Sequence, residues 1–160
     1  MHDPDFRYPV KGPIRVIDGD TVEVILDRGF GDLKKVSLRI NGVDAPESRT
    51  RKNLLEREAG KLITEVVIRW VLQNENLMFF ASSEEKPKYA GRIVGSLLAG
   101  GPAGWSLADF LIENGLARPY RGGKRVPWTD RKLKAILKEG RTYLDETPDR
   151  RLTDEEVLDQ

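Results

Sequence analysis

The sequence predicts an α+β fold in which a small β-barrel of five strands packs against three α-helices. Three observations support this fold class. Three apolar segments within residues 14–40 are typical of strands, the third of them alternates apolar and polar residues, and short turns separate the segments. The apolar period changes to that of a helix over residues 54–73. Two more apolar strands and two more capped helices follow in the second half of the chain.

The first three strands are expected to form a meander of neighbouring strands. Residues 14–18 and 21–26 flank an Asp-Gly step, which is typical of a hairpin turn. A turn with two glycines at residues 27–32 leads into a third strand at residues 35–40. This third strand alternates apolar and polar side chains, so one of its faces should be buried. Asn41-Gly42 then breaks the alternation and predicts a bulge or a bend.

The remaining elements complete the barrel and its helices. Residues 54–73 form the clearest helix, and residues 77–81 and 92–99 are read as two strands. Five strands with one helix after the third strand and two helices after the fifth fit a closed barrel of the oligonucleotide-binding (OB) type.

The second and third helices have start signals in the sequence. Ser106 followed by Asp109 resembles a capping box, and Gly115 is a typical helix stop. Thr129 or Asp130 opens the third helix. Of the tryptophans, Trp70 and Trp105 are interpreted as core or core-edge residues.

The chain is expected to contain one folded domain with two less ordered ends. Residues 1–13 are interpreted as a mobile N-terminal segment, residues 14–144 as the OB-type domain, and residues 145–160 as a loosely held acidic tail. Seven acidic and two basic residues give this tail a net charge of −5. Because the whole chain has a net charge of +1, the first 144 residues have a net charge of +6. A basic body favours an anionic partner such as a nucleic acid, and a soluble domain with a solvated tail is an equal alternative.

Missing residue types exclude several kinds of chemistry. The chain has no cysteine and a single histidine, His2, near its start. Thiol nucleophiles, disulfides and histidine acid–base chemistry are therefore excluded from the fold. A bound metal must be held by oxygen atoms, which favours calcium or magnesium. A general base must be a carboxylate, a lysine or a tyrosine.

No membrane partner is expected, because no apolar run approaches the roughly 20 residues of a membrane span. The first 12 residues contain no apolar segment of the signal-peptide type. The localisation stays open between cytoplasmic and exported with the signal removed.

The Asp18-Gly19-Asp20 sequence has one more carboxylate than a turn requires. A tight turn needs only Asp-Gly, and Asp20 falls on the same side of the next strand as its apolar residues. Two carboxylates beside an apolar strand predict a cation site. Taken alone, Asp18-Gly19 is more typical of a hairpin turn, and Asp20 could cap that turn.

Four charged residues are predicted at or near strand ends, where the mouth of a small barrel forms. They are Asp20, Arg39, Asp44 and Arg92. Each has an ordinary alternative: a turn residue for Asp44, an exposed strand residue or an ion-pair partner for Arg39, and a surface charge for Arg92.

Four motifs together resemble the staphylococcal nuclease (thermonuclease) family. They are Val-Ile-Asp-Gly-Asp-Thr-Val at 16–22, Leu-Arg-Ile-Asn-Gly-Val-Asp-Ala-Pro-Glu at 38–47, Gly-Arg at 91–92 and Asn-Gly-Leu-Ala at 114–117. The likeness extends from about residue 14 to residue 144. The resemblance implies a calcium-dependent nuclease that hydrolyses phosphodiester bonds of DNA and/or RNA with one calcium ion.

The resemblance also implies roles for single residues. Asp20, Asp44 and the main-chain carbonyl of Ala45 look like calcium ligands, and Asp18 looks like an outer-shell residue that acts through water. Two arginines, Arg39 and Arg92, look like the residues that hold the scissile phosphate. Glu47 looks like the carboxylate that orients or deprotonates the attacking water. Contacts with nucleic acid are expected from Lys88, Tyr89, Tyr120 and Arg121.

The substrate is expected to be single-stranded DNA or RNA, bound by a monomer. The basic segment at residues 118–128, which contains Tyr120 and Trp128, fits either a nucleic-acid surface or a solvated loop. The alternative functions are a non-catalytic nucleic-acid-binding module and a protein-interaction module on the same fold.

Overall fold

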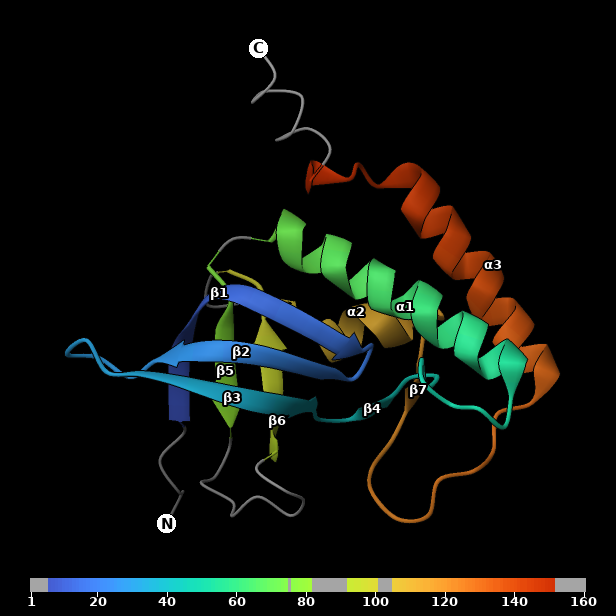
Figure 1. Ribbon diagram of the computed structural model, residues 1–160, viewed down its shortest axis with the longest axis horizontal. Helices are drawn as coiled ribbons and strands as arrows, with labels where there is room; N and C mark the ends of the chain where they lie inside the picture. The colour runs from blue at the N-terminus through green and yellow to red at the C-terminus, as the bar shows by residue number, and fades with distance from the viewer. Residues whose placement is uncertain (1–5, 75, 82–91, 101–104, 152–160) are drawn as a thin grey trace.

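Five strands curl into a closed barrel in the order β1-β2-β3-β6-β5. The computed structural model describes residues 6–74, 76–81, 92–100 and 105–151 (Figure 1). All neighbouring strands are antiparallel except β3 and β6, which pair in parallel. The barrel strands are β1 (Phe6–Asp18), β2 (Thr21–Asp27), β3 (Leu33–Ile40), β5 (Met78–Ala81) and β6 (Arg92–Leu98). The predicted five-stranded OB-type barrel with three helices is confirmed.

Side-chain alternation explains the barrel interior. From Val22 to Leu26 in β2 and from Val36 to Ile40 in β3, every second residue is buried, as expected for strands with one face toward the core. The two strands pair in register from Thr21 opposite Arg39 to Asp27 opposite Leu33. This register places the turn that contains Asp20 beside the end of β3.

Strand β1 begins at Phe6, so the prediction of a mobile segment over residues 1–13 is wrong for residues 6–13. Phe6 to Pro9 pair with β5, and Val10 pairs with Leu26 of β2. The prediction failed because Pro9, Gly12 and Pro13 are strand breakers in an isolated sequence. In the barrel, β1 has to reach two neighbours, and main-chain pairing to both supports an extended strand there.

The three helices cover the barrel and one another. Helix α1 (Leu54–Gln73) lies across the barrel strands, and α3 (Asp130–Glu146) packs along α1 (Figure 1). Asn53 caps α1 by accepting a hydrogen bond from the Glu56 main-chain N–H at 3.0 Å. Helix α2 (Leu107–Glu113) packs against β6. None of the described helices is long and apolar enough to cross a membrane.

The start signals predicted for the later helices are confirmed. The Ser106 hydroxyl accepts a hydrogen bond from the Asp109 main-chain N–H at 3.0 Å. Gly115 has a φ of +68° directly after α2, and Thr129 caps α3. Trp70 is buried as expected, but Trp105 is 61% exposed, so its prediction as a core or core-edge residue is wrong. Trp105 precedes the cap of α2, outside the apolar face of that helix.

A second, two-stranded sheet was not predicted. It consists of β4 (Val43–Asp44) and β7 (Arg118–Pro119), paired antiparallel. Gly42, with a φ of +82°, turns the chain out of β3 and into β4. The pairing puts Asp44 directly opposite Arg118. Strands of two residues have no period that a sequence pattern could show.

The start of the acidic tail is held against α1, which corrects the expectation of a loose segment after Leu144. The Arg69 Nη1 donates hydrogen bonds to the carbonyls of Leu144 and Thr147, at 2.6 and 2.9 Å. Arg151 pairs with Glu65 on the same helix. Residues 152–160 lie outside the described residues.

Two helical glycines provide a matched test of how α1 positions the segment after β4. A Cβ on Gly60 would lie 2.5 Å from the main-chain nitrogen of Ser48, whereas a Cβ on Gly140 would meet the flexible end of Leu62 at 2.8 Å. We expect Gly60→Ala to lower the free energy of unfolding by about 1–3 kcal/mol through overpacking.

Gly140→Ala makes the same chemical change in a helix, and we expect it to stay within about 1 kcal/mol of wild type, because helix propensity offsets the side-chain shift. Chemical denaturation of both variants measures the difference. Equal effects of the two substitutions would contradict this account of Gly60.

Candidate functional site

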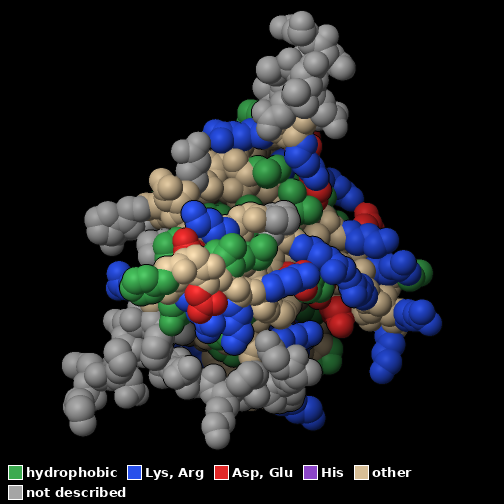
Figure 2. Space-filling model, turned by 60° about the vertical axis from the view of Figure 1, so that its left-hand side comes forward, with side chains coloured by type: hydrophobic (Ala, Val, Ile, Leu, Met, Phe, Trp, Pro, Cys, Tyr) green, Lys and Arg blue, Asp and Glu red, His purple; other side chains and the backbone are tan. Residues whose placement is uncertain are grey.

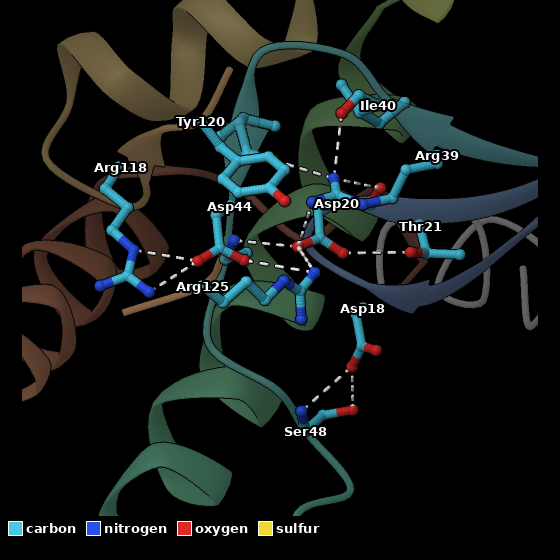
Figure 3. A network of polar contacts seen from close by, with 12 residues as sticks. Asp18, Asp20, Thr21, Arg39, Ile40, Asp44, Ser48, Arg118, Tyr120 and Arg125 are labelled. Atoms are coloured by element: carbon cyan, nitrogen blue, oxygen red, sulfur yellow. Dashed lines mark hydrogen bonds and ion pairs between the residues drawn. The ribbon is translucent and has the colours of Figure 1, made fainter. Parts of the chain in front are cut away.

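Two buried carboxylates face each other at the end of β3. Asp20, from the β1–β2 turn, is 4% exposed, and Asp44, from β4, is buried with 1% exposure. The Arg125 Nη2 lies between them, 3.9 Å from the Asp20 Oδ2 and 3.4 Å from the Asp44 Oδ1 (Figure 3). The structure therefore brings together the two aspartates that the sequence analysis assigned to one cation site.

Neighbouring groups fix the Asp20 carboxylate. The Ala45 main-chain N–H donates to Oδ2 at 2.9 Å, and the Thr21 hydroxyl donates to Oδ1 at 3.0 Å. The Arg39 Nη2 lies 3.6 Å from Oδ2. Burial nevertheless raises the pKa of Asp20 above its ordinary value of 3.8, because the loss of hydration outweighs the pull of Arg39 and the two hydrogen bonds.

Arg118 holds the Asp44 carboxylate on one side only. Its Nε and Nη2 lie 2.9 and 2.8 Å from Oδ2, and the Trp128 ring lies 3.8 Å from the guanidinium carbon. The second oxygen, Oδ1, is buried and has no hydrogen-bond donor among the described residues. Burial of an anionic oxygen without a hydrogen-bond donor costs free energy of folding, and a cation bound to this atom would reduce that cost.

Arg39 is anchored beside the carboxylates by main-chain carbonyls. Its Nη1 donates to the carbonyls of Ile40 and Val43, at 3.0 and 2.8 Å, where the chain leaves β3. The Tyr120 ring lies over the guanidinium, with its centroid 5.9 Å away. Because Arg39 is fixed at the site by these contacts, it presents its charge there at little further entropic cost.

Glu47 lies on the wall of a pocket that reaches Asp44. The pocket has a volume of about 180 Å³, and its wall includes Asp44, Glu47, Glu56, Arg118 and Trp128. Burial raises the pKa of Glu56 above its ordinary value, and the Glu47 carboxylate adds to this by repulsion. Glu47 itself is exposed, so solvent reaches its carboxylate.

The other predicted site residues are less closely engaged. Asp18 accepts hydrogen bonds from the main-chain N–H and hydroxyl of Ser48, and in Figure 3 it points to Ser48. Arg92 is exposed at the start of β6 and pairs with Ser37, on the same barrel face as Arg39 and about 7 Å along the strand.

No hydrogen bond or ion pair links Arg92 to the carboxylates within the part of the chain that the structure describes. The Tyr120 hydroxyl donates to the Gly123 carbonyl at 2.6 Å, and Arg121 is exposed in the same loop. Lys88 and Tyr89 lie outside the described residues, so their predicted contacts with nucleic acid stay predictions.

Three residues of the site were missed as such by sequence reasoning: Arg118, Arg125 and Glu56. The two arginines were assigned to a basic surface or a solvated loop. Only the pairing of β4 with β7 brings them to Asp44, 74 residues away in the chain from Arg118. No local pattern in the sequence signals that contact.

The donor set fits a divalent cation that prefers oxygen. Two carboxylates converge, and one buried carboxylate oxygen lacks a donor. No group of three or more acidic, histidine or cysteine side chains gathers anywhere in the described ranges. The remaining ligands would therefore be main-chain carbonyls and waters, both of which calcium accepts.

The fold and the site together define an OB-type barrel with a carboxylate pair and anchored arginines at one end of β3. Residues 37–142 match the family model described as "Staphylococcal nuclease homologue", and the chain belongs to this family. The match contains Arg39, Asp44, Glu47 and Arg92 and begins after Asp20.

A curated relative gives a similar result. A protein of Escherichia coli named "Uncharacterized endonuclease" is 30% identical to this chain over 108 residues. The aligned region covers 67% of this chain and 58% of that protein, so the chain spans little more than half the length of this relative.

Removing the arginine that clamps Asp44 should cost stability. We expect Arg118→Met to lower the free energy of unfolding in EDTA by about 2–3 kcal/mol, because it leaves a buried carboxylate with only the half-exposed Arg125. The double variant Arg118→Met, Asp44→Asn should recover part of the loss, since it removes the unpaired charge. Denaturation of the two variants gives the comparison, and an equal or larger loss in the double variant would contradict the pairing.

The raised pKa of Asp20 predicts a specific pH dependence without calcium. An acid with a raised folded-state pKa releases its proton more readily when unfolded, so stability falls as the pH rises above 3.8 through the folded-state value. The Asp20→Asn variant has no titratable carboxyl group at this position, so its stability lacks this pH dependence. In EDTA, the melting temperature of Asp20→Asn minus that of wild type should therefore increase over this pH range. A difference that stays constant or decreases would show that Asp20 ionises as easily in the fold as outside it.

Proposed function

We propose that this protein is a calcium-dependent nuclease that hydrolyses phosphodiester bonds of DNA and/or RNA. The observation that carries the proposal is the Asp20–Asp44 pair, with a buried oxygen that lacks a hydrogen-bond donor, beside the anchored Arg39. Membership of the staphylococcal nuclease homologue family and the similarity to an endonuclease support the same reaction class.

Asp20, Asp44 and the carbonyl of Ala45 would hold one calcium ion. The ion supplies positive charge for the developing negative charge of the phosphate. Asp18 acts farther out, through water, while it fixes Ser48 at the start of the loop that follows Glu47. The hydrogen bond from the Ala45 N–H to Asp20 supports this set, because it ties the two acidic segments together.

Arg39 and Arg92 bind the oxygens of the scissile phosphate. A guanidinium offers two parallel donors to phosphate, which a lysine cannot match. The common barrel face of the two arginines supports this role, since both can reach an anion bound over the outer side of β3 and β6. Their charge stabilises the transition state, in which the phosphate oxygens carry the most negative charge.

Glu47 accepts the proton of the attacking water on its carboxylate. Its exposure allows water to reach it, and its place on the pocket wall beside Asp44 puts it near the bound phosphate. The fold contains no histidine within the described residues, so a carboxylate is the natural base.

The substrate would be single-stranded. Residues 118–125 carry four basic side chains and no acidic one, and the Tyr120 and Trp128 rings lie beside them. Charge for phosphates and rings for unpaired bases are typical of single-strand binding. Figure 2 shows many lysine and arginine side chains at the centre and right of the face in view. The proposed unit is a monomer, because one chain supplies every residue of the site.

Digestion of a labelled oligonucleotide with calcium, magnesium or EDTA tests the proposal. We expect cleavage in calcium that EDTA abolishes and that Arg39→Ala lowers by about 10²–10³-fold, since a phosphate-stabilising donor is lost. Arg28→Ala is the matched control: Arg28 lies at the far turn of the β2–β3 hairpin, where it pairs with Asp32. Equal activity of wild type and Arg39→Ala would contradict the assigned site.

The water-activating role has its own test. Glu47→Gln keeps the shape of the side chain but cannot accept a proton, and we expect kcat to fall by about 10²–10⁴-fold with little change in oligonucleotide affinity. Glu58→Gln, an exposed residue of α1 that pairs with Arg141, is the control. Calcium-dependent oligonucleotide binding by wild type without any cleavage would instead support a non-catalytic binding module.

A further inference from the structure

Three arginines contact the carboxylate pair, and the two that contact Asp44, Arg118 and Arg125, are held very differently. Arg118 makes contacts of 2.8 and 2.9 Å to Asp44, stacks on Trp128, and its side chain is 19% exposed. Arg125 lies 3.4 Å from Asp44 and 3.9 Å from Asp20, and its side chain is 51% exposed. No hydrogen bond or ring contact fixes Arg125 among the described residues. Arg118 is therefore a fixed part of the site, whereas charge alone holds Arg125 there.

Arg125 also lies where a metal ion would be needed. The oxygen nearest to it is the Asp44 Oδ1, which is the oxygen that lacks a hydrogen-bond donor. A divalent cation bound to both aspartates would neutralise the same charge that Arg125 now neutralises. Two cations at one carboxylate pair repel each other, so the half-exposed arginine is the one that would leave.

We propose that Arg125 is an exchangeable counter-ion that pairs with Asp20 and Asp44 in the metal-free protein and with a substrate phosphate in the calcium-bound protein. This inference rests on the proposed function. Arg125 lies on the wall of the same pocket as Glu47, so a small movement of its side chain keeps it beside the bound strand. Arg125 is thus a substrate-binding residue that becomes available only after calcium has bound.

The exchange couples the two ligands. Calcium binding releases the guanidinium of Arg125 for a phosphate, and a phosphate that holds this guanidinium removes a competitor of calcium. By linkage, each ligand must raise the affinity for the other by the same factor. The protein would then bind nucleic acid weakly at the site until calcium is present.

Calcium titration by calorimetry, in the absence of nucleic acid, tests the first half of the proposal. We expect Arg125→Gln to bind calcium about fivefold more tightly than wild type, because a half-exposed competing cation has been removed. Arg121→Gln is the matched control: it removes the same charge from the same loop, and Arg121 makes no contact with the carboxylates in the described structure. We expect its calcium affinity to stay within about twofold of wild type.

An unchanged or weaker calcium affinity in Arg125→Gln would overturn the proposal, because it would make Arg125 a structural support of the carboxylates. An equal gain in Arg121→Gln would overturn it as well, since the effect would then be one of overall charge. Melting curves in EDTA show whether each variant is folded. The Arg125→Lys variant keeps the positive charge, so we expect its calcium affinity to lie closer to that of wild type than the affinity of Arg125→Gln does.

Oligonucleotide binding tests the second half. In a Glu47→Gln background, calcium should strengthen binding of a labelled single strand, and adding Arg125→Gln should reduce this gain at least about threefold. A gain that is the same with and without Arg125 would contradict the exchange. Wild-type protein that binds no calcium would instead contradict the proposed function, so the two failures are distinguishable.

Discussion

Two acidic side chains buried beside each other dominate the structure of this protein. Asp20 and Asp44 are almost inaccessible to solvent, and burial of a charge is unfavourable unless cations or donors compensate it. The chain supplies Arg39, Arg118 and Arg125, together with main-chain donors, around this pair. One carboxylate oxygen still lacks a donor. Three arginines thus surround two carboxylates, yet the hydrogen-bond donors do not reach every buried oxygen, and the proposed cation would bind at the oxygen that they leave.

The barrel and the helices provide the geometry that this pair needs. The β2–β3 register brings the Asp20 turn to the end of β3, and the bend at Gly42 carries the chain on to Asp44. The short sheet of β4 and β7 then fixes Asp44 to Arg118. Close packing of Gly60 on the chain around Ser48 fixes the path of the segment that carries Glu47. The contacts that stabilise this part of the fold therefore also position the candidate site. The burial of two carboxylates at that site costs free energy of folding.

Much of the fold could be predicted from the sequence, because alternation in β2 and β3 and the helical period of α1 report directly on burial. The start of β1 could not, since main-chain pairing on both sides overrides its prolines and glycine. For the site, the family resemblance pointed to Asp20, Asp44 and Arg39, which the structure places side by side. The place of Arg118 and Arg125 in the site was not predicted, because their contacts depend on the pairing of two short strands from distant parts of the chain. The roles of Ala45, Glu47 and Arg92 remain predictions for experiment.

We propose above all that Asp20 and Asp44 form one calcium site from which Arg125 is displaced. The most direct test is a crystal structure from crystals grown with calcium, in which the anomalous scattering of calcium is measured. The account predicts a single strong anomalous peak about 2.3–2.6 Å from an oxygen of each aspartate, with the Arg125 guanidinium turned away from both. No peak between the two aspartates, or a peak at another place with Arg125 still bridging them, would contradict it.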